Sequence, residues 1–233
     1  MSKKISDIVA AYNLLVRGIE GKAHEEEDRA YGGVIRAGKG LMVESITRLL
    51  LEIAWEELGG NSERISFTKI TKKLPIKHDY IEKIKNKIVK KYIFNHIENY
   101  YYTLKTDVHC SIDDNLVIGV ECKAYTENAM IKRILVDFTL MKSIWKDMHC
   151  FLLQLESQLG GDYSKLNSKT TFGSPSTHTL FSYFDVEIQI ITLLEGERKV
   201  DKAIHNPKYY KALEEIHLQR AIDKFKVVLK KYL

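Results

Sequence analysis

Two alternating runs of residues on either side of a short polar turn, Asp113-Asp114-Asn115, constrain this chain more than any other feature. Before the turn, the even positions from 102 to 112 are mostly apolar and the odd positions from 103 to 111 are polar; after it, the even positions from 116 to 124 are apolar. Alternation with a period of two predicts strands that bury one face, and a short Asp/Asn turn between them predicts an antiparallel hairpin.

The register of this hairpin is expected to bring charged residues together. If the turn has three residues, Ile112 pairs with Leu116, and the same count sets Asp107 directly opposite Glu121. Side chains in that relation have Cβ atoms roughly 4.5–5.5 Å apart, and Lys123 lies two residues further along the same face. Two acids so close are unfavourable unless a pKa rises or a divalent cation binds between them. The pattern therefore predicts a site made of two carboxylates and a lysine.

Asp107 followed by Glu121-Cys122-Lys123 on the next strand resembles the D…(D/E)xK signature of the PD-(D/E)xK nuclease superfamily, best known from type II restriction endonucleases. Thr106 stands where the family has a proline. The ExK triplet occurs three times in the chain, but only this copy ends an alternating strand with an acid opposite it. The alternative is an ordinary solvated strand face with a cross-strand pair between Lys105 and Glu121, and motif and context together favour the nuclease interpretation.

Composition sets broad limits on the protein. The chain has 233 residues, 45% of them hydrophobic and 29% charged, which is typical of one soluble globular domain. No apolar run approaches the roughly 18 residues of a membrane helix, so no membrane association is expected. Three cysteines, an odd number with the wrong spacing for zinc, predict free thiols and a reducing cytoplasm. The net charge of +5 permits a polyanionic partner. The basic residues concentrate at 69–91 and 220–231, as either solvated helix faces or phosphate-binding surfaces.

The order of predicted elements indicates an α/β fold: a central mixed β-sheet with a catalytic antiparallel hairpin flanked by helices, in a single nuclease domain over 1–233. Its parts are a mostly helical region at 1–99, a catalytic core of hairpin, helix and strand at 100–157, a polar recognition loop at 158–180, and a strand and C-terminal helix at 181–233. Periodicity predicts helices at 5–20, 41–58, 79–97, 126–146 and after Pro207, and strands at 150–155 and 184–190.

Further site candidates come from the helices and loops around the hairpin. The resemblance implies a glutamate from an early helix beside the metal site, and Glu44 is the candidate, although most glutamates on amphipathic helices face solvent, as Glu52 and Glu56 are expected to do. A glycine-punctuated stretch at 31–40 nearly matches a phosphate-binding loop, but Gly40 replaces the Ser/Thr and no strand precedes it. It is expected to be a DNA-contacting loop or a simple connection. The candidate DNA-binding residues are Lys39, Lys132, Arg133, Lys169, Ser174, Thr177 and His178.

Phosphodiester hydrolysis needs a cation that neutralises developing charge and activates a water molecule, and carboxylates are the ligands that suit magnesium. The resemblance implies that Asp107, Glu121 and the backbone carbonyl of Cys122 hold Mg²⁺, which Mn²⁺ can replace and which Ca²⁺ replaces without supporting cleavage. It also implies that Lys123 acts on the water and the phosphate; beside two acids, it is expected to stay protonated.

The expected function is therefore that of a Mg²⁺-dependent, sequence-specific endonuclease on double-stranded DNA, acting as a homodimer in the cytoplasm, with a companion DNA methyltransferase. Two alternatives stay open. One is a structure-selective repair or junction-resolving nuclease of the same superfamily, and the other is a non-catalytic DNA-binding protein.

Overall fold

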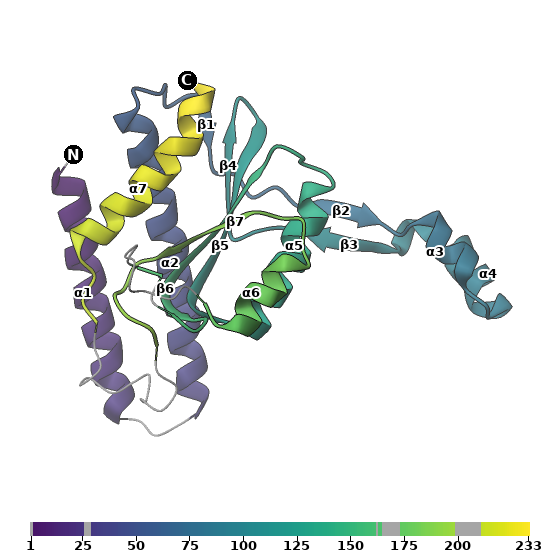
Figure 1. The fold of residues 1–233 in the computed structure, drawn as a ribbon, viewed down its shortest axis with the longest axis horizontal. Coiled ribbons are helices and arrows are strands. Elements are labelled where there is room, and N and C mark those ends of the chain that lie inside the picture. Colours follow the sequence, from purple (N-terminus) through teal and green to yellow (C-terminus); the bar gives the residue numbers. More distant parts are fainter. Residues whose placement is uncertain (1, 26–28, 162, 165–172, 199–210) are drawn as a thin grey trace.

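The computed structural model describes residues 2–25, 29–161, 163–164, 173–198 and 211–233. Their centre is a five-stranded sheet in the order β1-β4-β5-β6-β7 (Figure 1). The pairs β1–β4 and β4–β5 are antiparallel, whereas the pairs β5–β6 and β6–β7 are parallel, so the sheet is mixed. The strand bounds are Ile65–Ser66 for β1, Val108–Ile112 for β4, Asn115–Glu127 for β5, His149–Gln158 for β6 and Ile188–Thr192 for β7.

Helices cover both faces of the sheet. One face carries α1 (Ser2–Glu25), α2 (Arg29–Glu57) and α7 (Glu215–Leu229), followed by a short 3-10 turn, and the other carries α5 (Asn128–Lys142) and α6 (Pro175–Ser182) (Figure 1). Successive residues of β6 point to opposite faces: Phe151 stacks against Phe225 of α7 at 5.0 Å between ring centroids, whereas Leu152 packs with Phe138 of α5. The structure therefore confirms a single α/β domain built on a mixed sheet.

The hairpin between β4 and β5 has the predicted pairing but not the predicted turn. Asp113 and Asp114 have φ values of 49° and 63°, and the ladder closes with Ile112 opposite Asn115, so the turn has two central residues instead of three. Two positive φ values are typical of a type I′ turn, whose twist matches that of the strands. A bulge at Val117 then shifts the register and sets Cys110 opposite Ile118, which is the pairing the sequence predicts.

The expectation that this hairpin leaves one face open is wrong. Every residue of β4 is buried, including His109 and Ser111, which the alternation placed on the solvent face. The cause is tertiary, because α2 covers one face of the hairpin while α5 and the segment before β2 cover the other.

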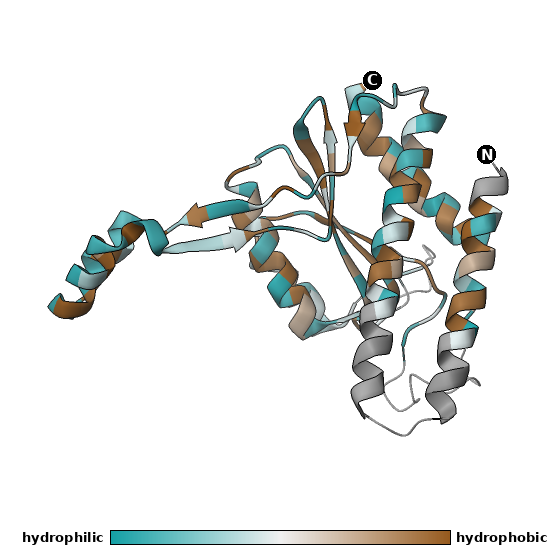
Figure 2. Ribbon diagram, turned by 180° about the vertical axis from the view of Figure 1, so that it is seen from behind, coloured by the Kyte–Doolittle hydropathy of each residue, from teal (hydrophilic) through white to brown (hydrophobic). Residues whose placement is uncertain are grey.

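The first alternating run is not one strand. Its beginning, β3 (Tyr101–Leu104), leaves the main sheet and pairs with β2 (Lys72–Pro75), and a bend at 105–107 connects it to β4. Between β2 and β3 lie α3 (His78–Lys83), α4 (Lys87–Asn95) and a 3-10 turn. These elements, residues 72–104, form a projection that we call the arm, which extends away from the sheet with α3 and α4 at its far end (Figure 1). The helical end of the arm mixes hydrophilic and hydrophobic residues (Figure 2).

Three other segments differ from the prediction. The helix predicted over 79–97 is split, because the Asn86 side chain accepts hydrogen bonds from the Ile88 and Val89 N–H groups and starts α4 there. The stretch 31–40, expected to be a loop, belongs to α2; Gly38 and Gly40 meet no neighbouring atom that a side chain would strike, and the packed second half of the helix offsets their low propensity. The polar loop predicted over 158–180 ends in α6. Among the described residues, no helix is long and apolar enough to span a membrane.

Candidate active site

Three charged side chains meet where the bend before β4 faces β5. The Lys123 Nζ atom lies 2.8 Å from Asp107 Oδ2 and 2.7 Å from Glu121 Oε2, and the Cys122 N–H donates to the same Asp107 oxygen at 2.8 Å. Glu121 and Lys123 share a face of β5 because they are two residues apart. The lysine and the aspartate side chains are each 29% exposed and the glutamate side chain 12%. The cluster is thus at the surface but partly withdrawn from water.

The bend that presents Asp107 is stabilised by its neighbour Thr106. The Thr106 hydroxyl donates to the Val108 carbonyl oxygen at 3.1 Å, and the Thr106 N–H donates to His109 Nε2 at 3.0 Å. A proline at this position, as in the resembled family, has no N–H and could not make the second bond. Thr106 therefore stabilises the bend through two hydrogen bonds, one of which a proline could not make.

His109 is a residue of this site that the sequence analysis did not select. It is fully buried, and the Ile70 N–H points at its Nδ1 atom from 2.6 Å while the Thr106 N–H points at its Nε2 atom. Burial lowers the pKa of His109 to about 4, so the ring is neutral and accepts at one nitrogen at a time. His109 occupies an odd position of the alternating run, as Asp107 does, and this shared face was the signal that could have identified it.

The pKa values of Glu121 and Lys123 are both shifted from their ordinary values. Burial raises the pKa of Glu121 to about 7; Lys123 acts against this shift and the nearby Asp107 adds to it. Burial lowers the pKa of Lys123. The negative charges of Glu121 and Asp107 and the hydrogen bonds to both raise it by a larger amount, so the net pKa lies above the ordinary value for lysine. The lysine is therefore protonated, and a second positive charge at this site would ionise Glu121 fully.

The donor atoms around Lys123 fit a hard divalent cation. Besides the two carboxylates, the ammonium group donates to the Cys122 carbonyl oxygen at 3.1 Å, so all three oxygens implied as ligands surround one positively charged nitrogen. Magnesium takes such oxygen ligands and completes its shell with water and phosphate oxygens. Within the described part of the chain, no group of three or more His, Cys, Asp or Glu side chains is arranged to hold a metal ion, so a cation bound here would need a further ligand such as the backbone carbonyl.

The structure pairs Glu44 with a residue outside the cluster. Its Oε2 atom lies 3.0 Å from Lys69 Nζ, and its side chain is 20% exposed. The charge of Lys69 lowers the pKa of His109 and that of Asp107 raises it, so both charges act on the same buried ring. On the same helix, Thr47 is fully buried and its hydroxyl lies 3.3 Å from Cys122 Sγ, a contact that sequence reasoning missed.

The three cysteines are free, as predicted, and all three are buried. Burial raises the pKa of Cys110 and of Cys150 to about 12, and it also raises the pKa of Cys122. The thiols are therefore protonated packing groups, and only the backbone of Cys122 takes part in the cluster.

The candidate DNA-binding residues are dispersed. Lys132 and Arg133 are exposed on α5, and Arg133 Nε lies 3.7 Å from Asp137, whose charge contributes to the raised pKa of Glu121. Arg133 is thus paired with an acid whose charge acts on the cluster. Lys39 lies half-buried within α2, and Lys169 falls outside the residues that the structure describes.

Thr177 corrects one of these expectations. It is fully buried, with its hydroxyl 2.6 Å from Asn128 Oδ1 and 2.9 Å from the Leu159 carbonyl oxygen, which leaves no surface to offer DNA. Ser174 accepts from the Thr177 N–H and caps α6. The two residues therefore fasten this segment to the start of α5.

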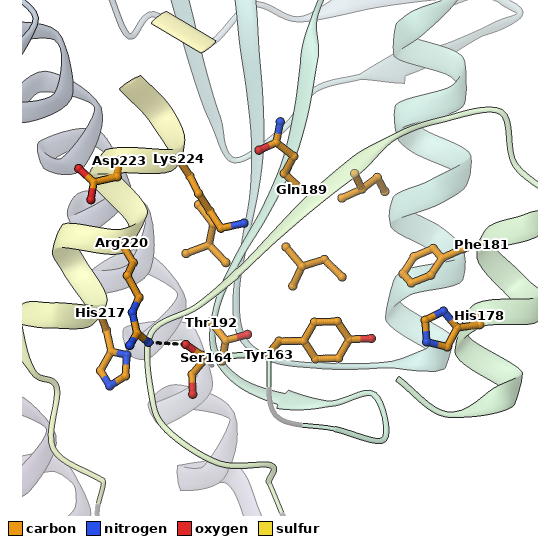
Figure 3. Close-up of a pocket in the computed structure, with 13 residues that line it drawn as sticks. Tyr163, Ser164, His178, Phe181, Gln189, Thr192, His217, Arg220, Asp223 and Lys224 are labelled. Carbon is orange, nitrogen blue, oxygen red and sulfur yellow. Dashed lines mark hydrogen bonds between the residues drawn. The ribbon is translucent and has the colours of Figure 1, made fainter. Parts of the chain in front are cut away.

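His178 is exposed on α6 and lines a pocket of about 650 Å³ at the β7 edge of the sheet (Figure 3). Phe181 of α6 and His217 and Arg220 of α7 also line the pocket, and Arg220 donates to the Ser164 carbonyl oxygen at 2.6 Å. Because β6 lies between β7 and β5, this pocket is separate from the carboxylate cluster.

Comparison with known proteins adds independent evidence. No family model matches the chain, and no solved structure matches it. The sequence is 47% identical over 225 residues to the type II restriction enzyme DdeI of Desulfomicrobium norvegicum, an alignment that covers 94% of this chain and 93% of the relative. Identity at this level over nearly the whole of both proteins confirms the resemblance noted in the sequence. The chain belongs to the family of type II restriction enzymes.

Proposed function

We propose that this protein is a sequence-specific endonuclease that hydrolyses phosphodiester bonds in double-stranded DNA, with Asp107, Glu121 and Lys123 at its reacting centre. Membership of the type II restriction enzymes supports the activity. The observation that supports this location is the convergence of three oxygen atoms on the Lys123 ammonium group within 3.1 Å. Partial burial strengthens each electrostatic interaction there.

Asp107, Glu121 and the Cys122 carbonyl would hold a divalent cation, with magnesium favoured by the all-oxygen ligand set and manganese as a substitute. When bound, the cation supplies charge neutralisation and a water molecule of lowered pKa. Lys123, protonated and released from its two carboxylates, would place its positive charge beside the phosphate oxygens, where negative charge develops. Thr106 and His109 hold the bend, so that Asp107 needs little rearrangement to act.

The assembly follows from the substrate. Each chain offers one such cluster among its described residues, whereas a duplex has two strands to cut, so a homodimer with one cluster per strand is the expected working form. A companion DNA methyltransferase would protect the DNA of the host cell, and the cytoplasm is where both would meet it.

Digestion of a plasmid tests the proposal directly. With magnesium or manganese, the wild-type protein should give a discrete set of fragments, and with calcium or a chelator none. Asp107→Asn should abolish cutting, whereas the matched variant Asp114→Asn, which alters an exposed acid of the same hairpin, should leave the fragments unchanged. Cutting by Asp107→Asn at the wild-type rate would remove the proposed site.

The alternative functions predict different results in the same assays. A structure-selective nuclease would nick the plasmid without discrete fragments. A non-catalytic DNA-binding protein would show no calcium binding at the cluster, whereas we expect calorimetry to detect calcium binding that Asp107→Asn removes. A flat titration of the wild-type protein would contradict the metal site itself.

A further inference from the structure

The arm, residues 72–104, carries the net positive charge of this protein. It contains eight lysines, no arginine and three acidic residues, a formal net charge of +5, which equals the +5 of the whole chain. The residues outside the arm are therefore neutral in sum. Such concentration on one projection is the electrostatic footprint of a surface that binds a polyanion.

The lysines of the arm are available to a partner. Lys90 is half-buried and pairs with Glu82 at 2.6 Å, and Lys73 lies 3.9 Å from the centre of the Tyr101 ring while remaining exposed. The exposed lysines are Lys72, Lys73, Lys77, Lys83, Lys85, Lys87 and Lys91. Ribbon and helices thus both present ammonium groups to solvent.

The arm is an ordered element with its own small core. Ile81 of α3 and Ile93 of α4 are 1% and 8% exposed, and Asn86 caps α4. The Ile76 N–H donates to the Tyr100 carbonyl oxygen at 3.0 Å, which extends the pairing of β2 and β3 toward the helices. Because the lysines stand on a preformed frame, binding through them costs little ordering entropy.

The base of the arm is joined to the carboxylate cluster. Leu104, the last residue of β3, is three residues before Asp107, and it is buried against α5. On the other strand, the segment that enters β2 bonds to His109 through Ile70 and to Glu44 through Lys69. A duplex with a phosphate at the cluster would therefore pass the base of the arm.

We propose that the arm is a DNA clamp whose lysines contact the phosphates of the duplex beside the bond that is cleaved. The proposal rests on the proposed function for its partner, and it assigns the arm a role in affinity and not in sequence reading. The four-residue strand β3 and the nine-residue helix α4 each extend about 13 Å, so placed end to end they would span at most roughly eight base pairs at 3.4 Å per step.

Pairing of the arm with a second copy of itself is disfavoured by the same features. Ile88 and Tyr92, one turn apart on α4, are 82% and 59% exposed, and Tyr80, Val89 and Phe94 are exposed as well. These apolar side chains stand among exposed lysines, whereas the core of a stable protein interface is depleted of charged residues. Two arms in contact would also oppose +5 with +5. A phosphate backbone, with one negative charge per about 1.7 Å, matches the arm instead.

The test is the salt dependence of binding to a fluorescein-labelled duplex, measured by anisotropy in a chelator so that nothing is cleaved. Each phosphate contact contributes a slope of about −0.9 to the plot of log affinity against log salt. Removing two contacts with Lys87→Ala/Lys91→Ala should lower the affinity at roughly 50 mM salt and make the slope less steep. The ratio of the wild-type affinity to the variant affinity should therefore fall about 12-fold between roughly 50 and 200 mM salt. The charge-preserving variant Lys87→Arg/Lys91→Arg should bind as the wild type does.

The matched control is Lys230→Ala/Lys231→Ala, which removes two exposed lysines near the C-terminus. An unaltered slope in the arm variant, or an equal change in the control, would overturn the clamp. Sedimentation of Ile88→Ser adds a second criterion, since an unchanged mass supports the clamp and a reduced mass identifies the arm as a subunit contact. Because binding is measured without metal, plasmid cutting by Asp107→Asn would overturn the proposed reacting centre and leave this result standing.

Discussion

The protein contains two antiparallel ribbons, β2–β3 and β4–β5, which share the first alternating run of the sequence because that run forms both β3 and β4. The surroundings of the two ribbons are opposite. In the ribbon β4–β5, every residue of β4 is buried, because helices and a connecting segment cover both faces. In the ribbon β2–β3, three of the four residues of β3 are exposed. One ribbon withdraws charged groups from water and shifts their pKa values, and the other displays lysines on both sides of a projection. Burial, and not strand pattern, separates the two roles.

The comparison is sharpest for two lysines, one on β5 and one in the bend at 105–107. Lys123 lies in the cluster, whereas Lys105 is exposed in the connection to the arm. Replacing Lys123 with alanine should lower the rate of plasmid cleavage by about 10²–10³-fold, because it removes positive charge from the reacting phosphate. Lys105→Ala should change the rate little. Single-turnover cleavage at saturating protein measures both, and equal rates would break the distinction.

Two isoleucines extend the comparison to stability. Ile118 in β5 is fully buried, whereas Ile88 in α4 is 82% exposed. Ile118→Ala should lower the free energy of unfolding by about 2–5 kcal/mol, since it leaves a cavity. Ile88→Ala should change it by less than about 0.5 kcal/mol. Urea denaturation gives both values, and a large loss for Ile88→Ala would mean that the arm packs against another surface.

A substitution in the turn of the buried ribbon should increase the stability of the protein. Asp114 has a φ of 63°, where a side chain costs energy that glycine does not, and Asp-Gly is a favoured type I′ pair. Asp114→Gly should therefore raise the free energy of unfolding by about 0.5–1 kcal/mol, seen as a higher Tm. Asp113, which pairs with Arg64 at 2.8 Å, is kept so that only the backbone changes. A lower Tm would mean that the entropy of glycine outweighs the relief.

The smallest expected effect concerns the tie between the arm and the body. Tyr102 donates to Asp137 Oδ1 at 3.2 Å, and the charge of Asp137, with burial and this bond, raises the pKa of the tyrosine. Tyr102→Phe should cost less than about 1 kcal/mol, because both groups are near water. A raised pKa means that this contribution is complete below the ordinary tyrosine pKa of about 10 and lost as the pH rises through the folded value. Thermal unfolding of both proteins at rising pH should therefore converge; a constant difference would rule out the bond.

Much of the site followed from local pattern. Alternation placed Asp107, Glu121 and Lys123 on one face, and the structure brings them within hydrogen-bond distance of each other. The count was correct for the wrong reason, because a two-residue turn and a bulge together give the pairing that a three-residue turn would give. Register is set by the sum of such irregularities, and parity alone cannot distinguish them.

Other errors arose where packing overrides pattern. His109 and Ser111 read as solvent-facing because they are polar, and helix coverage buried them. Thr177 read as a DNA contact because it lies in a polar segment, yet its hydroxyl is used up by Asn128 and Leu159. The division of one alternating run into β3 and β4 had a local signal that was passed over, because Thr106 interrupts the apolar even positions where the bend lies.

The sequence by itself determined which charged groups are available: two acids and a lysine at a spacing that suits the proposed nuclease site, and a lysine cluster in one short span. Only the tertiary structure decided where each operates. It closed both faces of one ribbon, which shifted the charges of the cluster, and it extended the other as an exposed arm attached beside Asp107. The reason is that residue type and period act over a few positions, whereas burial depends on elements far apart in the chain.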